Sequence, residues 1–267
     1  MNKLKSLIDS EKVKIKKLLQ NQKAFKEKEG CFVYELEADV TIPSEYILLM
    51  HFLGKIDLKL EEKITKYIIS KQNKDGGWPL FYDGETDLSA SVKAYYALKL
   101  SGMNEKSLVL SKAKKCIIEK GGANSVNVFT KISLALFNQI PWRAIPFMPV
   151  EIIKFPKWFP FHIYKISYWS RTVLIPLLII MHEKPVASNP NAIDIDELFT
   201  NEIMRVRSEK SLSQSFLSVL FFFLENICRL LFPLLPKGMK EESKKEIINW
   251  LLPRLNGEDG LGGIFPA

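Results

Sequence analysis

The carboxylates that could do acid–base chemistry are most densely placed in Asp-Ile-Asp-Glu, at residues 194–197. Neighbouring carboxylates can keep one member of the group protonated through mutual repulsion. This group, however, follows a polar loop and precedes Leu198 and Phe199, and acidic side chains favour the positive end of a helix. We therefore interpret residues 194–197 as a loop that runs into a helix start. A catalytic role for these carboxylates is the less favoured interpretation.

Histidine and cysteine side chains form no recognisable metal or nucleophile pattern. The three histidines and three cysteines are far apart in the sequence, and no Cys-x-x-Cys pair is present. A zinc site is therefore not expected, and the cysteines are typical of buried thiols in a reducing compartment. The chain also has no Gly-x-Ser-x-Gly elbow, phosphate-binding loop or dinucleotide fingerprint.

A glutamine, two glycines and a tryptophan are grouped in Gln-Asn-Lys-Asp-Gly-Gly-Trp, residues 72–78. The segment follows an amphipathic helical pattern, and a glutamine amide can cap a helix end while glycine permits a turn. Fainter versions of helix, polar turn, glycine and aromatic occur at residues 18–32 and 250–263. This repeat predicts stacked helical hairpins that bury their apolar faces against their neighbours.

Helical patterns also dominate the segments that must position these groups. In residues 87–102 we expect Asp87 to be the N-cap and Gly102 to end the helix, and residues 111–122 end in a pair of glycines. No stretch of six or more residues alternates strictly between polar and apolar side chains. The sequence therefore predicts an all-α fold.

The middle of the chain is rich in proline and aromatic residues. Residues 138–190 contain eight prolines and three tryptophans. Because proline lacks an N–H and has a fixed φ, we expect no long uninterrupted helix here. Packing in a core is the favoured interpretation, and lining a cavity is the alternative.

Residues 215–235 are the most hydrophobic stretch, but polar side chains interrupt it at Glu225, Asn226 and Arg229. A bilayer-spanning helix needs about 20 predominantly apolar residues, so a full span is not expected. Two alternatives remain open from the residues alone. The stretch is either a buried core helix or a helix that dips into one leaflet beside basic residues.

The chain is basic, with a net charge of +8 and nine lysines in its first 28 residues. We predict an N-terminal basic helix at residues 1–17, which lacks the apolar run of a secretory signal. A solvated helix face is the favoured interpretation of the lysines, and attraction to an anionic membrane is the alternative. No nucleic-acid partner is predicted, because no basic stripe interleaved with aromatics and no zinc-finger spacing is present.

Six segments resemble, in the same order, the N-terminal half of the squalene–hopene cyclases, which are bacterial class II triterpene cyclases. The segments are residues 76–102, 141–153, 158–178, 184–190, 195–199 and 255–267. The resemblance implies that residues 18–267 form an N-terminal α/α-barrel domain, a toroid of helical hairpins that is incomplete at the C-terminus. We expect the missing hairpins to leave apolar faces uncovered.

The resemblance also implies structural and membrane roles for particular residues. Gln72, Gly76 and Trp78 match the family's QW motif, in which glutamine and tryptophan tie neighbouring helices together. The family's membrane-facing helix lies near residues 215–235, which favours contact with one leaflet and a monotopic position on the cytoplasmic side of the membrane. The expected lipid contacts are Leu217, Leu220, Phe221, Phe222, Phe223, Leu224, Leu231 and Phe232.

The family's reaction implies which residues meet the substrate. An aspartic acid of an Asp-x-Asp-Asp motif protonates a terminal alkene of squalene, and aromatic faces stabilise the resulting carbocation without a metal or organic cofactor. Trp169 is expected to face the cavity. Ile166 and Leu174 fall where the entrance channel narrows, and Phe265 falls near a cavity-lining position.

In the family, the catalytic acid belongs to the other barrel, in a part of the family's sequence that follows the segment matched by residue 267. Residues 194–197 match a different family segment. We therefore expect no cyclase activity from this polypeptide alone. One alternative is half of a split cyclase with a C-terminal partner chain, and another is a non-catalytic, membrane-associated lipid-binding remnant. A prenyltransferase β-subunit would need a zinc site, for which no residues are spaced.

Overall fold

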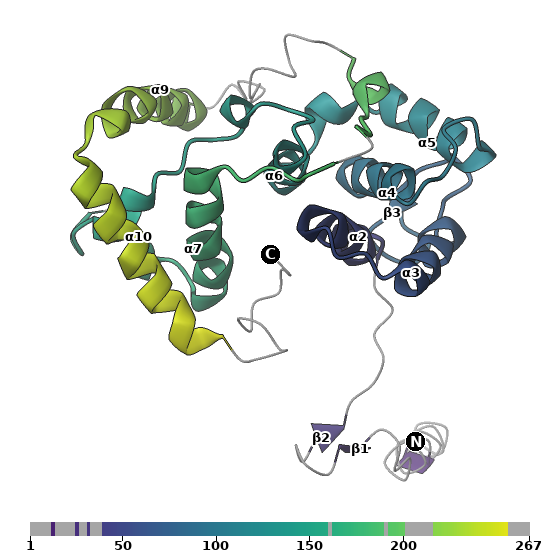
Figure 1. The fold of residues 1–267 in the computed structure, drawn as a ribbon, viewed down its shortest axis with the longest axis horizontal. Helices are drawn as coiled ribbons and strands as arrows, with labels where there is room; N and C mark the ends of the chain where they lie inside the picture. The colour runs from purple at the N-terminus through teal and green to yellow at the C-terminus, as the bar shows by residue number, and fades with distance from the viewer. Residues whose placement is uncertain are drawn as a thin grey trace, which may run out of the picture. The chain divides into compact units, whose positions relative to one another are not determined.

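The computed structural model describes residues 12–13, 25–26, 31–32, 39–159, 162–189, 192–200 and 216–255 (Figure 1). The chain divides into two compact units, Met1–Ala38 and Asp39–Ala267. In the first unit, β1 (Phe25–Lys26) pairs antiparallel with β2 (Cys31–Phe32). Lys12 and Val13 are helical, while the rest of the basic helix predicted at 1–17 lies outside the described residues. The predicted domain at 18–267 stays a prediction.

Helices form most of the second unit, and the all-α prediction is confirmed. Its strands, β3 (Trp78–Pro79) and β4 (Thr86–Asp87), are only two residues long each. The α-helices are α2 (Thr41–Leu53), α3 (Leu58–Ser70), α4 (Leu88–Leu100), α5 (Leu108–Glu119), α6 (Val128–Leu136), α7 (Tyr168–Glu183), α9 (Phe216–Leu231) and α10 (Lys237–Leu251). Short 3-10 turns join them: η2 (Ala123–Ser125), η3 (Trp142–Ala144), η4 (Val150–Lys154), η5 (Ile163–Lys165), η6 (Asp196–Leu198), η7 (Phe232–Leu234) and η8 (Leu252–Arg254).

Side-chain caps define where several helices begin. The carboxylate of Asp87 accepts a hydrogen bond from the N–H of Ala90 at 2.7 Å, as the sequence pattern predicted. Asp57 caps α3 in the same way, accepting from the N–H groups of Lys59 and Leu60. These caps satisfy N–H groups that have no partner within the helix. Gly102, with φ +85°, takes the left-handed conformation two residues after α4 ends.

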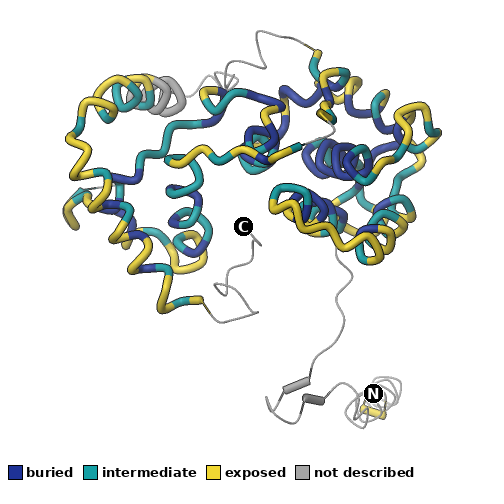
Figure 2. The backbone as a smooth tube through the Cα atoms, in the orientation of Figure 1, coloured by how far each residue is buried: buried dark blue, intermediate teal, exposed yellow. Residues whose placement is uncertain are grey.

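The first hydrophobic core is built around α4, which is buried along nearly its whole length (Figure 2). Helices α2, α3, α5 and α6 and strand β3 all pack against it. Trp78, Tyr95 and Tyr96 are fully buried there. A helix surrounded on all sides needs no polar face, which explains why its sequence is apolar around most of its circumference.

A second core cluster lies where α7, α10 and η4 meet, and it includes Ile175, Ile247 and Trp250. Helix α7 takes part in both clusters, because Leu177 belongs to the first and Leu178 to the second. The two clusters therefore share one helix, and the packing of each depends on the position of α7.

The proline-rich middle is only partly as predicted. Before α7 it forms the short turns η3, η4 and η5, but α7 itself runs for 16 residues with Pro176 inside it. The expectation of no long helix is therefore wrong for Tyr168–Glu183. Pro176 removes one main-chain donor, and burial of its neighbours Ile175 and Leu177 offsets that cost.

Candidate functional site

A cavity of about 240 Å³ lies between α2, α6 and α7. Four of its lining residues are aromatic, and most of the others are aliphatic. The lining comprises Ile42, Glu45, Tyr46, Leu48, Leu49, Phe52, Phe129, Ile132, Ser133, Leu136, Phe137, Leu177, Ile180 and Pro185. A cavity of this composition suits an apolar ligand.

The aromatic rings of the cavity are held by edge-to-face contacts. The ring centroids of Phe52 and Phe137 are 6.4 Å apart, and those of Phe137 and Tyr96 are 5.4 Å apart. Both distances lie in the range of favourable aromatic pairs. Because Tyr96 is fully buried in α4, the first core fixes the position of Phe137 in the wall.

One charged side chain, Glu45, lines this apolar cavity. Its Oε1 lies 2.7 Å from Nζ of Lys93, and the two side chains are only 13% and 3% exposed. Burial raises the pKa of Glu45, and the attraction and hydrogen bond of Lys93 offset only part of that effect. Removing either partner would leave a buried charge unpaired, so the pair holds α2 in place against α4.

Helix α2 is apolar on two opposite faces. One face is buried, with Ile47, Leu48 and Met50 in the first core. The other face carries apolar side chains at i, i+4, i+7 and i+11 that are about half exposed, namely Ile42, Tyr46, Leu49 and Leu53. Three of these four also line the cavity, so the apolar lining continues onto the surface of the helix.

Trp169, predicted to be a cavity wall, lies in the first turn of α7 and is 54% exposed. Its ring centroid is 6.4 Å from that of Tyr168, in an edge-to-face arrangement. The α7 residues that line the cavity beside α2 are Leu177 and Ile180, about two and three turns further along the helix. The structure therefore places Trp169 in a separate aromatic surface at the start of α7.

Ile166 and Leu174, predicted to flank an entrance channel, are both partly buried. Ile166 packs against the second core cluster, and its carbonyl accepts a hydrogen bond from Nη1 of Arg171 at 3.0 Å. The guanidinium carbon of Arg171 lies 5.3 Å from the centroid of the Tyr164 ring and 5.9 Å from that of Tyr168. This cation holds η5 and the start of α7 together. Phe265 lies outside the described residues.

The group at residues 72–78 joins three elements through main-chain carbonyls. Nε2 of Gln72 donates to the carbonyl of Gly76 at 2.8 Å and to that of Val109, at the start of α5, at 2.9 Å. The indole Nε1 of Trp78 donates to the carbonyl of Ile68 in α3 at 2.7 Å. The amide and the indole each bond to the main chain, and together they tie α3, the turn and α5 to one another.

Gly76 stands in this turn where a side chain would not fit. Its φ is +96°, and an added Cβ would lie 2.6 Å from the carbonyl carbon and oxygen of Lys112. The close approach of the turn to α5 therefore requires glycine at this position.

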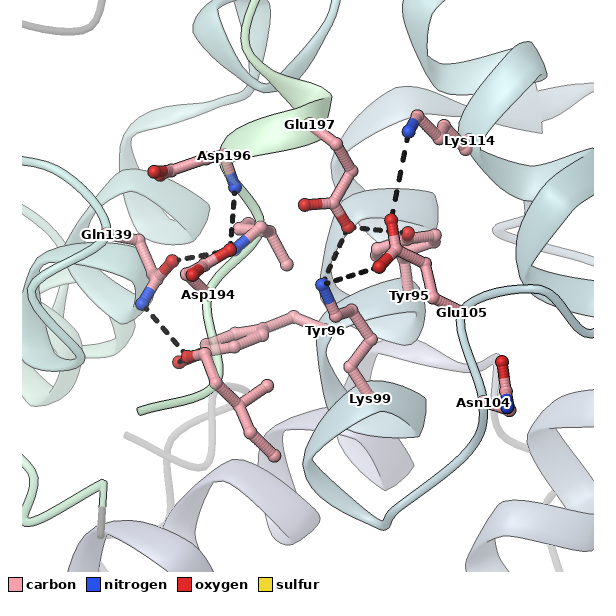
Figure 3. A network of polar contacts seen from close by, with 12 residues as sticks. Tyr95, Tyr96, Lys99, Asn104, Glu105, Lys114, Gln139, Asp194, Asp196 and Glu197 are labelled. Atoms are coloured by element: carbon pink, nitrogen blue, oxygen red, sulfur yellow. Dashed lines mark hydrogen bonds and ion pairs between the residues drawn. The ribbon is translucent and has the colours of Figure 1, made fainter. Parts of the chain in front are cut away.

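The carboxylates at residues 194–197 are tied to α4 and its surroundings (Figure 3). Oε1 of Glu197 accepts from the hydroxyl of Tyr95 at 2.7 Å and from Nζ of Lys99 at 2.8 Å. Burial raises the pKa of Glu197, but the hydrogen bonds from Lys99 and Tyr95 outweigh it and hold the pKa below its usual value. A carboxylate that is ionised and accepts two hydrogen bonds is a poor proton donor. The predicted helix start is the 3-10 turn η6.

The apolar helix α9 is anchored through the polar residues that interrupt its sequence. Oε1 of Glu225 accepts from the main-chain N–H of Phe147 at 2.9 Å and lies 2.8 Å from Nη2 of Arg229. Arg229 lies in turn over the ring of Phe147, with 5.6 Å between the guanidinium carbon and the centroid. These contacts hold one side of α9 against the segment that follows η3.

Several apolar side chains of α9 and η7 point away from this anchor. Phe223, Leu230, Leu231 and Leu234 are 62%, 72%, 53% and 77% exposed. Phe232 differs, because it is partly buried and its ring packs edge-to-face against Phe147 and Phe155. The other predicted lipid contacts have side chains outside the described residues: Leu217, Leu220, Phe221, Phe222 and Leu224. Within the described ranges, every helix is too short or too polar to cross a bilayer.

The cavity beside α2 was missed by the sequence analysis. A signal for it was present in residues 41–53, where apolar side chains recur on both sides of one helix. One such face packs in a core, and the second needs another partner or a ligand. Which face borders a cavity depends on α6 and α7, which lie far along the chain.

Comparisons with known proteins identify relatives of this chain. The protein-family model described as the squalene-hopene cyclase N-terminal domain matches residues 14–267 of this chain. The squalene–hopene cyclase of Zymomonas mobilis is 45% identical over 240 residues, which are 90% of this chain and 36% of that protein. The squalene–hopene cyclase of Alicyclobacillus acidocaldarius is 33% identical over 239 residues, 89% of this chain and 37% of that protein.

A plant relative with a different product name is also similar. The dammaradiene synthase of Dryopteris crassirhizoma is 31% identical over 238 residues, 89% of this chain and 35% of that protein. The chain thus spans about a third of the length of these curated relatives.

Proposed function

Because the chain belongs to the squalene–hopene cyclase family, we propose that it acts as the N-terminal portion of such a cyclase and forms part of the wall around squalene or a similar polyprenoid. The whole enzyme would convert squalene to hopanoid triterpenes through a carbocation cascade that a proton starts. The observation that carries this proposal is the apolar cavity between α2, α6 and α7, with its aromatic lining.

The chemistry of a polyprenoid matches this cavity. A hydrocarbon offers no hydrogen-bonding group, so its binding depends on the apolar area removed from water, at about 25 cal/mol per Å². Phe52, Phe129 and Phe137 contribute such area in the wall, and the faces of their rings attract positive charge. The cavity therefore supplies what both the ligand and a passing carbocation need.

The exposed aromatic surface at the start of α7 is the second part of the proposal. Trp169 and Tyr168 are both exposed, by 54% and 44%. We assign Trp169 to the wall of the complete substrate cavity, and Ile166 and Leu174 to the approach to it. Phe265 belongs to the same proposal through its sequence position alone.

The initiating proton must come from another segment. The sequence contains no Asp-x-Asp-Asp, and Glu197, in its densest carboxylate group, is held as a carboxylate by Tyr95 and Lys99. These 267 residues alone are therefore expected not to cyclise squalene. Two alternatives to the N-terminal portion of a cyclase are half of a split cyclase, whose partner chain carries the acid, and a membrane-associated lipid-binding protein without chemistry.

Contact with one membrane leaflet is part of the same proposal. The exposed apolar side chains of α9 and η7 would enter the leaflet, while the pair Glu225–Arg229 holds the opposite side of the helix. A squalene-binding protein gains from this position because its substrate dissolves in the bilayer. We place the protein on the cytoplasmic side of the membrane, as a monotopic protein.

A binding measurement tests the proposed ligand. Squalene in detergent micelles is expected to bind the full chain, and Phe129→Ala is expected to weaken binding about tenfold or more, because burying a phenylalanine side chain contributes about 1.5–3 kcal/mol. Phe81→Ala is the matched control, since Phe81 is 71% exposed and lies outside the cavity. Equal affinities of the two variants would contradict the assignment of the cavity.

A companion assay separates the alternatives for activity. The chain is incubated with squalene alone and with a polypeptide that supplies an Asp-x-Asp-Asp segment from a relative, and hopene is measured. Product only in the mixture would support a split or partial cyclase. Product from the chain alone would contradict the proposed origin of the proton, and squalene binding without product in either case would favour the lipid-binding alternative.

A further inference from the structure

A second cavity, of about 320 Å³, lies between the segment after η3, the end of α7, and the region where α9 passes through η7 into α10. Its lining differs from that of the first cavity because it carries four arginine and lysine cations. These are Arg143, Lys184, Arg229 and Lys240. His182 also lines it, and Glu151 is its one carboxylate. A cavity with this excess of positive charge favours an anion.

Three of the four cations have no acidic partner in the part of the chain that the structure describes. Arg229 is paired with Glu225, but neither Arg143 nor Lys184 lies within ion-pair distance of a described carboxylate. Lys240 donates only to the carbonyl of Pro233, at 3.3 Å. These cations are therefore available to a ligand, and arginine and lysine together suit the oxygens of a phosphate group.

The wall of the cavity continues into an apolar surface. Phe232 and Pro233 line it, and the neighbouring Leu230, Leu231 and Leu234 are all exposed. A phosphate bound among the cations would therefore lie beside a surface suited to hydrocarbon chains. That combination matches an amphiphile better than a free inorganic anion.

We propose that this cavity is a binding site for the phosphate group of an anionic phospholipid, whose acyl chains lie along η7 and the end of α9. Arg143, Lys184 and Lys240 contact the phosphate. Arg229 shapes the site, since Glu225 already neutralises it. This inference rests on the proposed membrane contact of α9, to which it adds a preferred lipid class.

A substitution of Glu151 tests the site through an expected increase in affinity, whereas loss of the cations is expected to lower it. It is 4% exposed, lies in η4 and faces the same cavity without a described partner. Its negative charge opposes a phosphate, so Glu151→Gln is expected to strengthen binding. A variant that merely damaged the fold would weaken binding instead.

The experiment is sedimentation of the full chain with vesicles of phosphatidylcholine alone and of phosphatidylcholine mixed with phosphatidylglycerol. The triple variant Arg143→Gln/Lys184→Gln/Lys240→Gln is expected to lose about 100-fold in affinity for the anionic vesicles, since each cation near a surface contributes about fivefold. The control Lys59→Gln/Lys63→Gln/Lys112→Gln removes the same charge from exposed positions outside the cavity and is expected to change affinity less than about fivefold.

The outcomes separate the site from the membrane contact. Equal losses in the two triple variants, or a failure of Glu151→Gln to strengthen binding, would overturn the site in favour of general charge attraction. Equal binding of the unaltered chain to both vesicles would overturn the site and leave the membrane contact of α9 standing. Binding to neither vesicle would overturn both.

A calorimetric titration with inorganic phosphate distinguishes the source of the anion. Weak binding of phosphate beside tight binding to anionic vesicles is expected, because the acyl chains add apolar contact that free phosphate lacks. Tight phosphate binding that the cavity triple variant abolishes, without any preference for anionic vesicles, would overturn the assignment to a phospholipid.

Discussion

At the scale of single residues, the chain uses polar side chains mainly to hold the main chain in position. Gln72 and Trp78 both donate to carbonyls of neighbouring helices, and Glu197 accepts from two donors at the edge of α4. Such bonds matter most where the group left behind would be buried and unpaired. The residue types that first suggested chemistry therefore hold neighbouring elements together.

Trp78→Phe tests this at one atom. The substitution keeps most of the buried ring but removes the Nε1–H donor, which leaves the carbonyl of Ile68 without that bond. The free energy of unfolding is expected to fall by about 1–3 kcal/mol, measured by urea denaturation. Trp158→Phe is the control, because Trp158 is 78% exposed. Equal effects in the two variants would show that the hydrogen bond contributes nothing.

At the scale of elements, short segments fasten long helices at particular places. The turn η6 is joined to α4 by Glu197, which accepts hydrogen bonds from Tyr95 and Lys99, 102 and 98 positions earlier in the chain. Glu225 and Arg229 anchor α9 to the segment after η3 in a similar way. In each case, hydrogen bonds from polar side chains hold an apolar helix against a distant segment of the chain.

The anchor at η6 predicts a dependence of stability on pH. The pKa of Glu197 lies below its usual value because the hydrogen bonds from Lys99 and Tyr95 outweigh the effect of burial. Its contribution is therefore fully present above the pKa of the unfolded chain, near 4.5, and is lost as the pH falls through the lower folded value.

We expect Glu197→Gln to flatten the fall of unfolding free energy with acidification, measured by urea denaturation from neutral pH to below the usual glutamate pKa. Glu85→Gln is the control, because Glu85 is exposed and makes no ion pair with a described residue. An unchanged slope in Glu197→Gln would show that this carboxylate is not linked to folding.

At the scale of the second unit, Asp39–Ala267, two hydrophobic clusters share helix α7. The first cluster surrounds α4 and borders the first cavity, which α2, α6 and α7 line. The second cluster lies under α10 and η4, beside the second cavity with its four cations. Because α7 contributes to both, displacement of α7 from one cluster also disturbs the other. We therefore expect the packing around the two candidate ligand sites to be coupled through α7.

Ile247→Ala tests that coupling. Ile247 is fully buried in the second cluster, so the substitution is expected to cost about 2–5 kcal/mol and to lower the midpoint of a single unfolding transition. The transition is followed by hydrogen exchange in α4 as well as in α10. Ile248→Ala is the matched control, since Ile248 is 41% exposed. Loss of protection in α10 with α4 unaffected would show that the clusters unfold separately.

The sequence by itself determined the helical class, the cap at Asp87, the turn at residues 72–78 and the family, because each depends on residues close together in the chain or on a colinear pattern. Local spacing also indicated that residues 194–197 run into a helix start, which in the structure is the 3-10 turn η6. It did not reveal that α7 continues through Pro176, since the burial that offsets the missing hydrogen bond comes from distant segments.

Only the tertiary structure decided which apolar faces border a cavity. The side chains of α2 line a cavity because α6 and α7 return to it from about 80 to 140 residues further along the chain. The cations of the second cavity come together in the same way, from η3, the end of α7, α9 and α10. Periodicity describes the faces of one helix, whereas the partner of each face is set by long-range packing.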